Sequence, residues 1–366
     1  MAQGFFRRKG KTAEEADAFQ RFIDQKLREL SHTPSGKKRK TSSPARAKIK
    51  FPAKKSAKGK GRRKRILLSP GKATMAPEKA KKAAAKRITP VAIVPKRPGA
   101  SENPYLPKPY RVLDYVRESP DTFTIAVDMK TYHDPGQFVQ VSLPGFGESP
   151  ISICSDSREF IRLNIREVGT VTKALAKLKV GDTVLIRGPY GRGYPMQALR
   201  GNDLIIIGGG CGVAPLKGII DYVYNHRAAY KDIYLFLGYR SPDDILFQKE
   251  LEQWKKDYHV HMTVDENKQQ KFCYEATTGF VTDKLKAAPI DNHGKVAFVC
   301  GPPIMMKFTT HILKEKGFND DQIFVSAERL MYCALGVCCH CMIRGKFTCI
   351  DGPVFRYDEI GHIKND

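Results

Sequence analysis

Long apolar runs and early cysteines are both missing from this chain, and each absence narrows what the protein can be. No stretch approaches the roughly 18 consecutive apolar residues that a membrane-spanning helix needs. The N-terminus also lacks the apolar segment of a secretory signal peptide. All nine cysteines come after residue 150. We therefore expect a cytoplasmic protein with no membrane span, whose clustered thiols serve metal or redox chemistry rather than disulfides.

Acidic residues are scarce in the first hundred positions, which hold 30 Lys and Arg but only 6 Asp and Glu. The remaining positions are nearly neutral, with 33 basic and 32 acidic side chains. Residues 31–98 are rich in Lys, Ala, Pro and Ser and have little to bury, so we expect disorder there. Apolar spacing over 13–30 predicts one short amphipathic helix. Residues 1–100 are thus interpreted as a basic, mostly disordered tail.

The charge of this tail leaves two kinds of partner open. Its Lys and Arg side chains suit an acidic protein subunit, and they also suit the phosphates of nucleic acid. Aromatic residues are almost absent from 31–98, so a nucleic-acid contact would be non-specific and without base stacking. Tethering to a protein complex is the first interpretation, and DNA contact is the second.

From residue 101 to 199 the sequence is typical of an antiparallel β-barrel. One short helix is predicted at 171–178 from its apolar spacing. The predicted strands are apolar runs separated by Gly, Pro and Asp turns, at 111–117, 122–128, 138–143, 160–165 and 183–187.

Between residues 200 and 325 strands and helices alternate, which predicts a parallel sheet with helices on both faces. The predicted strands are 204–207, 233–238, 259–264 and 296–300, and the predicted helices are 215–228, 243–256, 280–287 and 303–316. The expected fold is therefore a β-barrel domain, an α/β nucleotide-binding domain and a C-terminal cysteine-containing segment over 326–366.

A glycine-rich turn, Gly-Gly-Gly-Cys-Gly-Val-Ala-Pro at 208–215, follows the first strand of the α/β half and opens a helix. Glycine lets the backbone approach a pyrophosphate closely, and the helix N-terminus offers N–H donors. A tight turn without a ligand is the simpler alternative. Two more loops at the same predicted sheet edge, 238–240 and 300–303, favour a nucleotide site.

Three loops of the barrel half suit a second cofactor. Residues 169–172 (Gly-Thr-Val-Thr) open the short predicted helix, so its N–H groups and the Thr172 hydroxyl suit a phosphate. Residues 150–155 are an extended run of small and β-branched residues that suits the flat face of a ring. Residues 187–191 read Arg-Gly-Pro-Tyr-Gly. Ordinary barrel turns are the alternative interpretation of all three.

Four cysteines near the C-terminus, Cys333, Cys338, Cys341 and Cys349, have the spacing C-x4-C-x2-C-x7-C. The first three match the plant-ferredoxin arrangement that holds a [2Fe–2S] cluster. A zinc site is the alternative, because zinc also takes Cys and His ligands and His340 is adjacent.

Taken in order, these segments resemble the ferredoxin–NADP reductase superfamily. The resemblance rests on Pro-Ile-Ser-Ile at 150–153, the motifs at 169–172 and 187–191, the glycine turn at 208–215, Cys-Gly-Pro-Pro at 300–303, and Ser-Ala-Glu-Arg at 326–329 before the cysteine loop. Within the superfamily, the chain is most similar to the flavin/iron–sulfur electron-transfer subunits of cytoplasmic NiFe hydrogenases. The corresponding subunits of anaerobic sulfite reductase and dihydroorotate dehydrogenase share the pattern. The similarity covers about residues 103–360 and leaves the tail unmatched.

The resemblance implies FAD, NAD(P)H and a [2Fe–2S] cluster as cofactors, with Cys300 at the catalytic position beside the nicotinamide. FAD would lie along 150–155 with its pyrophosphate near 169–172, and the nucleotide would lie over 208–215. The implied cofactor-binding residues are Pro150, Ile151, Ser152, Ile153, Gly169, Val171, Thr172, Gly188, Gly208, Gly209, Gly210, Gly212, Pro215, Arg240, Gly301 and Pro302. The implied metal ligands are Cys333, Cys338, Cys341 and Cys349.

A redox partner is implied as well, because the terminal electron acceptor belongs to another polypeptide. The first interpretation is a subunit that relays electrons to or from a hydrogenase or sulfite reductase. The alternatives are a dihydroorotate dehydrogenase electron-transfer subunit, or a nucleic-acid-binding redox sensor that uses the basic tail. Arg240 has two equal interpretations, a contact to the 2′-phosphate of NADP or a surface charge, and the sequence leaves NAD and NADP both open.

The chain departs from the family at two places. Glu148-Ser-Pro-Ile-Ser152 stands where many superfamily members carry an Arg-x-Tyr-Ser flavin motif, so Arg166 and Arg187 are the candidates to replace that arginine. In the cysteine loop, Cys339 and Ala334 occupy positions where relatives have glycine. Cys339 is thus either an extra thiol or an exchangeable ligand. The cysteines without a partner at ligand spacing, which are expected to be small buried residues, are Cys154, Cys211, Cys273 and Cys300.

Overall fold

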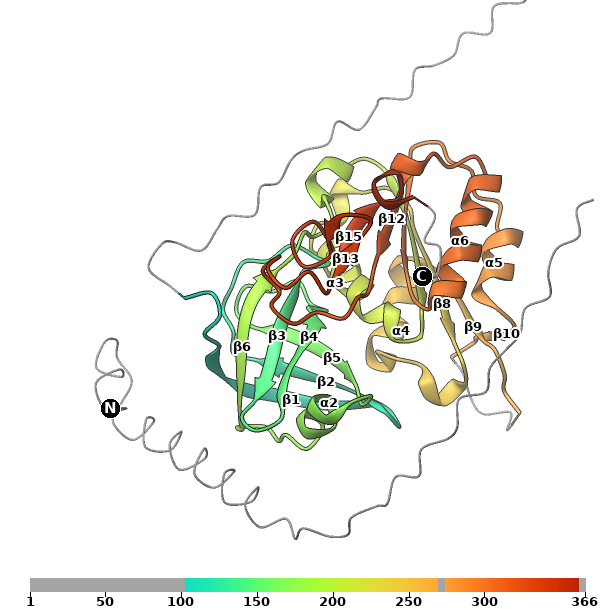
Figure 1. Cartoon of the computed structure of the whole chain (residues 1–366). Coiled ribbons are helices and arrows are strands. Elements are labelled where there is room, and N and C mark those ends of the chain that lie inside the picture. Colours follow the sequence, from blue (N-terminus) through green and yellow to red (C-terminus); the bar gives the residue numbers. More distant parts are fainter. Residues whose placement is uncertain (1–102, 269–273, 362–366) are drawn as a thin grey trace, which may run out of the picture. The chain divides into compact units, whose positions relative to one another are not determined.

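The computed structural model describes residues 103–268 and 274–361. The predicted tail over 1–100, its helix at 13–30 and Cys273 lie outside the described residues. An antiparallel sheet is followed along the chain by a mixed sheet covered by helices (Figure 1). None of the helices in the described part of the chain combines the length and apolar character that crossing a bilayer requires.

The antiparallel sheet has six strands in the order β4-β3-β6-β1-β2-β5. Its strands are β1 (Lys108–Ser119), β2 (Thr122–Val127), β3 (Phe138–Leu143), β4 (Gly147–Ser152), β5 (Ile161–Arg166) and β6 (Thr183–Tyr190). The edge strands also approach each other, since Ile153 bridges to Leu163 and the Cys154 N–H donates to the Arg162 carbonyl at 2.9 Å. Alternate residues such as Val139 and Val141 fill the core of this sheet.

The mixed sheet has seven strands in the order β10-β9-β8-β7-β11-β12-β15. Its strands are β7 (Asp203–Gly209), β8 (Ile233–Tyr239), β9 (His259–Val264), β10 (Thr277–Thr278), β11 (Lys295–Cys300), β12 (Ile323–Ser326) and β15 (Val354–Arg356). Every neighbouring pair is parallel except β12 and β15.

Helices cover both faces of the mixed sheet because its central strands are apolar on both sides. In β7, Leu204 and Ile206 belong to the core that also contains residues of α3 and α4, whereas Ile205 and Ile207 belong to the core with residues of α5 and α6. The α-helices are α2 (Thr170–Leu175), α3 (Val213–Asn225), α4 (Gln248–Asp257), α5 (Val281–Ala287), α6 (Pro303–Glu315) and α7 (Tyr357–Ile360). The predicted alternation of strands and helices is confirmed. Short 3-10 helices are η1 (Met196–Leu199), η2 (Gly210–Gly212), η3 (Arg227–Ala229), η4 (Pro242–Asp244) and η5 (Asp320–Gln322).

Strand β15 corrects the expectation of a purely parallel sheet. Residues 354–356 lie in the segment that the sequence separated from the α/β half, yet they pair antiparallel with β12. A three-residue edge strand is too short to show alternating apolar and polar residues, and its partner β12 is distant in the sequence. The consequence is that the cysteine loop starts and ends on the same sheet edge, with the small hairpin of β13 (Met342–Ile343) and β14 (Lys346–Phe347) inside it.

Candidate functional site

The glycine turn and the Cys-Gly-Pro-Pro loop meet at the carboxyl ends of β7 and β11. Cys300 is paired in register with Gly208. A Cβ added to Gly212 would lie 2.6 Å from the Cα of Gly301, and one added to Gly209 would lie 2.3 Å from the Met305 sulfur. At Gly212 the clash is with the backbone of the second loop, so only glycine fits there, whereas at Gly209 it is with the flexible end of the Met305 side chain. The sequence placed both loops at one sheet edge, and the structure brings them into contact.

Gly210 differs from its neighbours because it faces open space. It has a φ of +54°, and no atom lies within 4 Å of the position a Cβ would take. Helix α3 begins just beyond it without a side-chain cap, but its first turn offers few N–H donors, because the Val213 N–H already donates to the Gly210 carbonyl and Pro215 has no N–H. An anion at this turn would meet the positive end of the helix dipole.

Cys300, the predicted catalytic residue, ends β11 with only 1% of its surface exposed. Burial raises the pKa of its thiol, so the residue stays neutral. Glu328 lies nearby, and partial desolvation raises the pKa of its carboxyl although the side chain reaches solvent. A buried, neutral thiol does not act as a thiolate nucleophile, and the place of Cys300 beside the nicotinamide stays a prediction. The sequence analysis named Glu328 only within the Ser-Ala-Glu-Arg motif at 326–329 and gave it no role of its own.

Cys211 contradicts the expectation of a buried thiol. It is exposed, while Cys154 is buried as predicted. The reason is local, because Cys211 lies in the η2 turn rather than on a strand or a packed helix face. Its side chain lies beside Arg166 of β5, so the glycine turn approaches the antiparallel sheet there.

The segment predicted to face a flat ring is strand β4 and the residue after it. Pro150 and Ser152 are partly exposed, while Ile151 and Ile153 point into the core. Gly169 begins helix α2, and no atom lies within 4 Å of the position its Cβ would take. The Thr172 hydroxyl is already engaged, because it accepts the N–H groups of Val168 and Gly169, each at 3.0 Å. Backbone N–H groups, not this hydroxyl, are therefore left for a phosphate.

The two arginines offered as flavin-phosphate ligands have different surroundings. The Arg187 guanidinium is 5% exposed and forms a two-pronged ion pair with Glu148, at 2.7 and 2.5 Å. It also donates to the carbonyls of Cys333 at 2.8 Å and Tyr332 at 3.2 Å. Arg187 is therefore committed to the cysteine loop. Arg166 is about half exposed and pairs with Asp121 at 2.7 Å, so it remains near the surface.

The cysteine loop directs backbone N–H groups at its thiols. Cys333 Sγ accepts from Leu335 and Val337 at 3.4 Å and from Cys338 at 3.5 Å. Cys349 Sγ accepts from Gly336 at 3.2 Å, and it lies 3.3 Å from Cys341 Sγ. Such donors stabilise thiolates and are a feature of iron–sulfur sites. The residues present therefore fit an iron–sulfur cluster.

The four thiols differ in their surroundings. A hydrogen bond from the backbone N–H of His340 is the main reason that the pKa of Cys338 is lowered to about 7. Burial, together with the hydrogen bond from Cys341, raises the pKa of Cys349 to about 12. Among the described residues, no group of three or more His, Cys, Asp and Glu side chains is placed to hold one metal ion.

Two residues of the loop adopt the glycine-like backbone that the family comparison suggested. Ala334 has a φ of +60° and Cys339 a φ of +62°. Non-glycine residues in this region cost about 1 kcal/mol. Cys339 is exposed, and its Sγ donates to the Val337 carbonyl at 3.8 Å. The geometry favours an extra thiol over a ligand.

We expect Cys339→Gly to retain the full iron content and to raise the free energy of unfolding by about 1 kcal/mol, because glycine tolerates this φ. Iron and sulfide analysis and urea unfolding measure both quantities. Cys339→Ser is the matched control, since it removes the thiol and keeps the strain. Loss of iron from both variants would show that Cys339 is a ligand.

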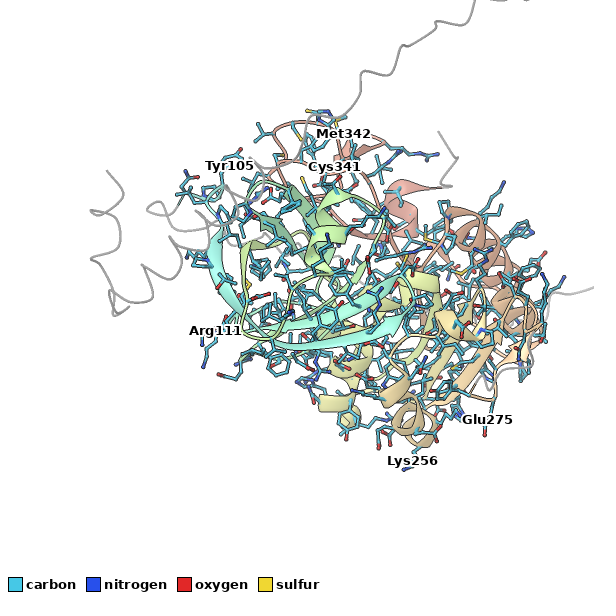
Figure 2. All side chains as sticks on the ribbon, turned by 90° about the horizontal axis from the view of Figure 1, so that it is seen from below. Tyr105, Arg111, Lys256, Glu275, Cys341 and Met342 are labelled. Carbon is cyan, nitrogen blue, oxygen red and sulfur yellow. The ribbon has the colours of Figure 1, made fainter. Side chains whose placement is uncertain are left out.

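The cysteine loop packs directly on the antiparallel sheet. Phe138 of β3 shares one buried cluster with Met331, Ala334, Cys341 and Cys349. Figure 2 shows Cys341 buried among side chains while the neighbouring Met342 reaches the surface. A redox centre held by these thiols would therefore sit against the sheet that carries β4.

A surface cleft of about 370 Å³ lies elsewhere. It is lined by Arg117–Pro120 at the end of β1, by Pro242, Asp243 and Gln248, and by Tyr274. None of the predicted site residues lines it, although Arg240 lies two positions before Pro242. The cleft is therefore separate from the residues predicted to bind the cofactors.

Two parts of the chain match known families, namely the oxidoreductase NAD-binding domain over 206–311 and the iron–sulfur cluster binding domain of dihydroorotate dehydrogenase B over 328–361. Sulfhydrogenase 2 subunit gamma of Pyrococcus furiosus is 39% identical over 61% of this chain and 83% of its own length. A probable dihydroorotate dehydrogenase B (NAD(+)) electron transfer subunit of Methanocaldococcus jannaschii is 32% identical, over 69% and 91%. The solved structure of an NADH-dependent reduced ferredoxin-NADP oxidoreductase aligns with a TM-score of 0.57 and 27% identity, over 69% and 90%.

The fold, the nucleotide turn and the thiol loop define a ferredoxin–NADP reductase-like oxidoreductase with an iron–sulfur segment. More narrowly, the chain belongs to the family of electron-transfer subunits that includes the sulfhydrogenase gamma subunits and the dihydroorotate dehydrogenase B electron-transfer subunits. The predicted resemblance, the oxidoreductase class and the cofactors NAD(P)H, FAD and an iron–sulfur cluster are confirmed. Because the relatives are electron-transfer subunits, a partner catalytic subunit is implied.

Proposed function

We propose that this protein relays electrons between NAD(P)H and a partner redox subunit through FAD and a [2Fe–2S] cluster. When bound, the nicotinamide and flavin exchange a hydride, and the cluster exchanges single electrons. The observation that carries the proposal is the packing of the cysteine loop on β3 and β6, which brings the thiols against the sheet that offers β4. Close packing suits electron transfer between two centres held on one rigid element.

The chain's own residues divide the work of binding and orientation. In this proposal the antiparallel sheet is a barrel spanning 101–199 that holds FAD along 150–153, near 169–172 and Gly188. The α/β domain over 200–325 holds the nucleotide at 208–215 and at 300–302. Residues 326–366 hold the cluster through Cys333, Cys338, Cys341 and Cys349.

The choice between NAD and NADP rests on Arg240 in this proposal. Arg240 follows β8, and its charge acts on Asp265 and Glu266, the two residues after β9. These acids offset a positive charge that would otherwise favour a 2′-phosphate. We therefore expect NADH to be used at a lower KM than NADPH. Steady-state kinetics with both nucleotides measures the preference, and a lower KM for NADPH would reverse this assignment.

The partner is proposed to be a hydrogenase or a sulfite reductase, with a dihydroorotate dehydrogenase as the alternative. Relatives named as subunits of sulfhydrogenase and of dihydroorotate dehydrogenase support the first and the last of these. Purification of the native complex and identification of the accompanying subunit decides among them.

The experiment that tests the proposal is reconstitution with FAD, iron and sulfide, followed by spectroscopy and dye reduction. We expect flavin and cluster absorbance together with NAD(P)H-dependent reduction of a one-electron dye. A fully loaded preparation that reduces no dye with either nucleotide would refute the relay.

We expect Gly212→Ala to weaken nucleotide binding by at least about tenfold while FAD stays bound, because the added methyl group would separate the two loops at the sheet edge. Binding is measured by titration of the oxidised protein with a nucleotide analogue. Gly294→Ala is the control, since Gly294 has a φ of +62°, open surroundings and a position in the turn before β11. Equal weakening by both variants would contradict the nucleotide site.

A further inference from the structure

Gln140 of β3 is a buried polar side chain with no partner in the described part of the chain. It is 0% exposed, and neither its amide nitrogen nor its amide oxygen forms a hydrogen bond. A buried, unpaired amide costs on the order of 1–3 kcal/mol for each unmet group. Native proteins rarely leave such a group without a ligand, an ion or water. Gln140 therefore points to something that is bound beside it.

The strand register fixes the direction of this side chain. Val139 and Val141 point into the core of the antiparallel sheet, so Gln140 points to the opposite face, as Phe138 does. Gln140 is directly opposite Arg187 in the pairing of β3 with β6. Side chains directly opposite in an antiparallel pair lie on one face. The Arg187 guanidinium on that face contacts the carbonyl of Cys333.

The cysteine loop packs on the face of the sheet to which Gln140 points. Phe138, two residues away on the same face, packs in the cluster that contains Cys341 and Cys349. The loop's own N–H groups reach Cys333 and Cys349 from within the loop. Gln140 lies on the sheet between two residues that contact the loop, because it is two positions from Phe138 on β3 and opposite Arg187 on β6. Thiolates and sulfides of an iron–sulfur centre carry negative charge there and accept N–H donors.

We propose that the Gln140 side chain donates an N–H hydrogen bond to a sulfur of the iron–sulfur centre and so sets its reduction potential. This inference rests on the proposed function. A donor at sulfur stabilises the reduced cluster more than the oxidised one, because reduction adds negative charge. Gln140 then contacts the cluster directly from the sheet that is proposed to carry the flavin.

The test is an EPR-monitored redox titration of the full-length, cofactor-loaded protein, with the flavin potential measured in parallel. In Gln140→Met we expect the ratio of reduced to oxidised cluster at a fixed potential to fall about tenfold, which is 59 mV for one electron. The flavin potential stays unchanged. Ser142→Ala is the matched control on the same strand face; the Ser142 hydroxyl donates to the Leu185 carbonyl at 3.4 Å, and its loss leaves both potentials in place.

An unchanged cluster potential in Gln140→Met would overturn the inference, and so would a shift of the flavin potential in its place. If the Met variant does not hold the cluster, Gln140→Glu decides. A carboxyl group beside the cluster makes the cluster potential depend on pH between about pH 6 and 9. A potential constant over that range would also overturn it. A wild-type protein that binds no cluster refutes the proposed function, whereas a loaded protein with unmoved potentials refutes only the role of Gln140.

Discussion

Replacing Cys349 by Ser is expected to remove the iron–sulfur absorbance and EPR signal while the flavin remains bound. Cys349 is fully buried, its sulfur accepts the Gly336 N–H at 3.2 Å, and it lies 3.3 Å from the Cys341 sulfur. A serine oxygen is a poor substitute for a thiolate toward iron. Loss of groups that merely support ligands already costs about 10–100-fold in metal affinity, so loss of a ligand exceeds that.

In Cys349→Ser we expect NADH oxidation at the flavin to be separated from electron transfer through the cluster. NADH oxidation that ends on the flavin, measured with a hydride-accepting dye, is expected to continue, because the segments proposed to bind the nucleotide and the flavin, 208–215 and 150–153, are unchanged. Reduction of a one-electron protein acceptor depends on the cluster and is expected to be nearly abolished. Iron analysis, visible spectroscopy and the two dye assays measure the separation.

Cys211→Ser is the control because Cys211 is exposed in the η2 turn and belongs to a different loop. It is expected to retain the full iron content. Retention of a complete cluster in Cys349→Ser would contradict the ligand assignment. Loss of flavin together with the cluster would instead show that the loop is needed for the fold of the sheet below it.

The strands and helices were predictable because each carries a local signal. Alternating apolar residues in β2 and β3, and the unbroken apolar run of β7, have the periods expected for strands with one or two buried faces. The cysteine loop was equally visible, since four cysteines at ligand spacing lie within seventeen residues. Family resemblance then assigned these local signals to cofactors.

What the sequence could not reveal is how distant segments pair. Strand β15 joins β12 across the whole cysteine loop, and Arg187 contacts Cys333 although 146 positions separate them. Glu148 looked like a departure from a flavin motif, but in the structure it is the partner of Arg187. Gln140 lies within a mostly apolar strand. Its only sequence signal is a polar residue on a strand whose neighbours are buried.

Arg187→Ala is expected to lower the free energy of unfolding by about 3–5 kcal/mol and to release the cluster, because it leaves the Glu148 carboxylate partly buried without its partner. The change also removes the donors to the carbonyls of Cys333 and Tyr332, which hold the start of the cysteine loop. Urea unfolding and the iron content after gel filtration measure the two effects. Lys130→Ala, which breaks an ion pair about 70% exposed on both sides, is the control and is expected to cost less than about 1 kcal/mol.

The origin of the loss can be separated by a second substitution. In Arg187→Met with Glu148→Gln, the unpaired charge is gone while the loop donors are still missing. We expect this double variant to recover much of the unfolding free energy but to bind iron as poorly as Arg187→Ala. Recovery of both would mean that the charge alone matters. Recovery of neither would place the whole effect in the contact between Arg187 and the cysteine loop. The free energy of unfolding thus reports on the ion pair of Arg187 with Glu148, and the iron content reports on the hydrogen bonds from Arg187 to the loop.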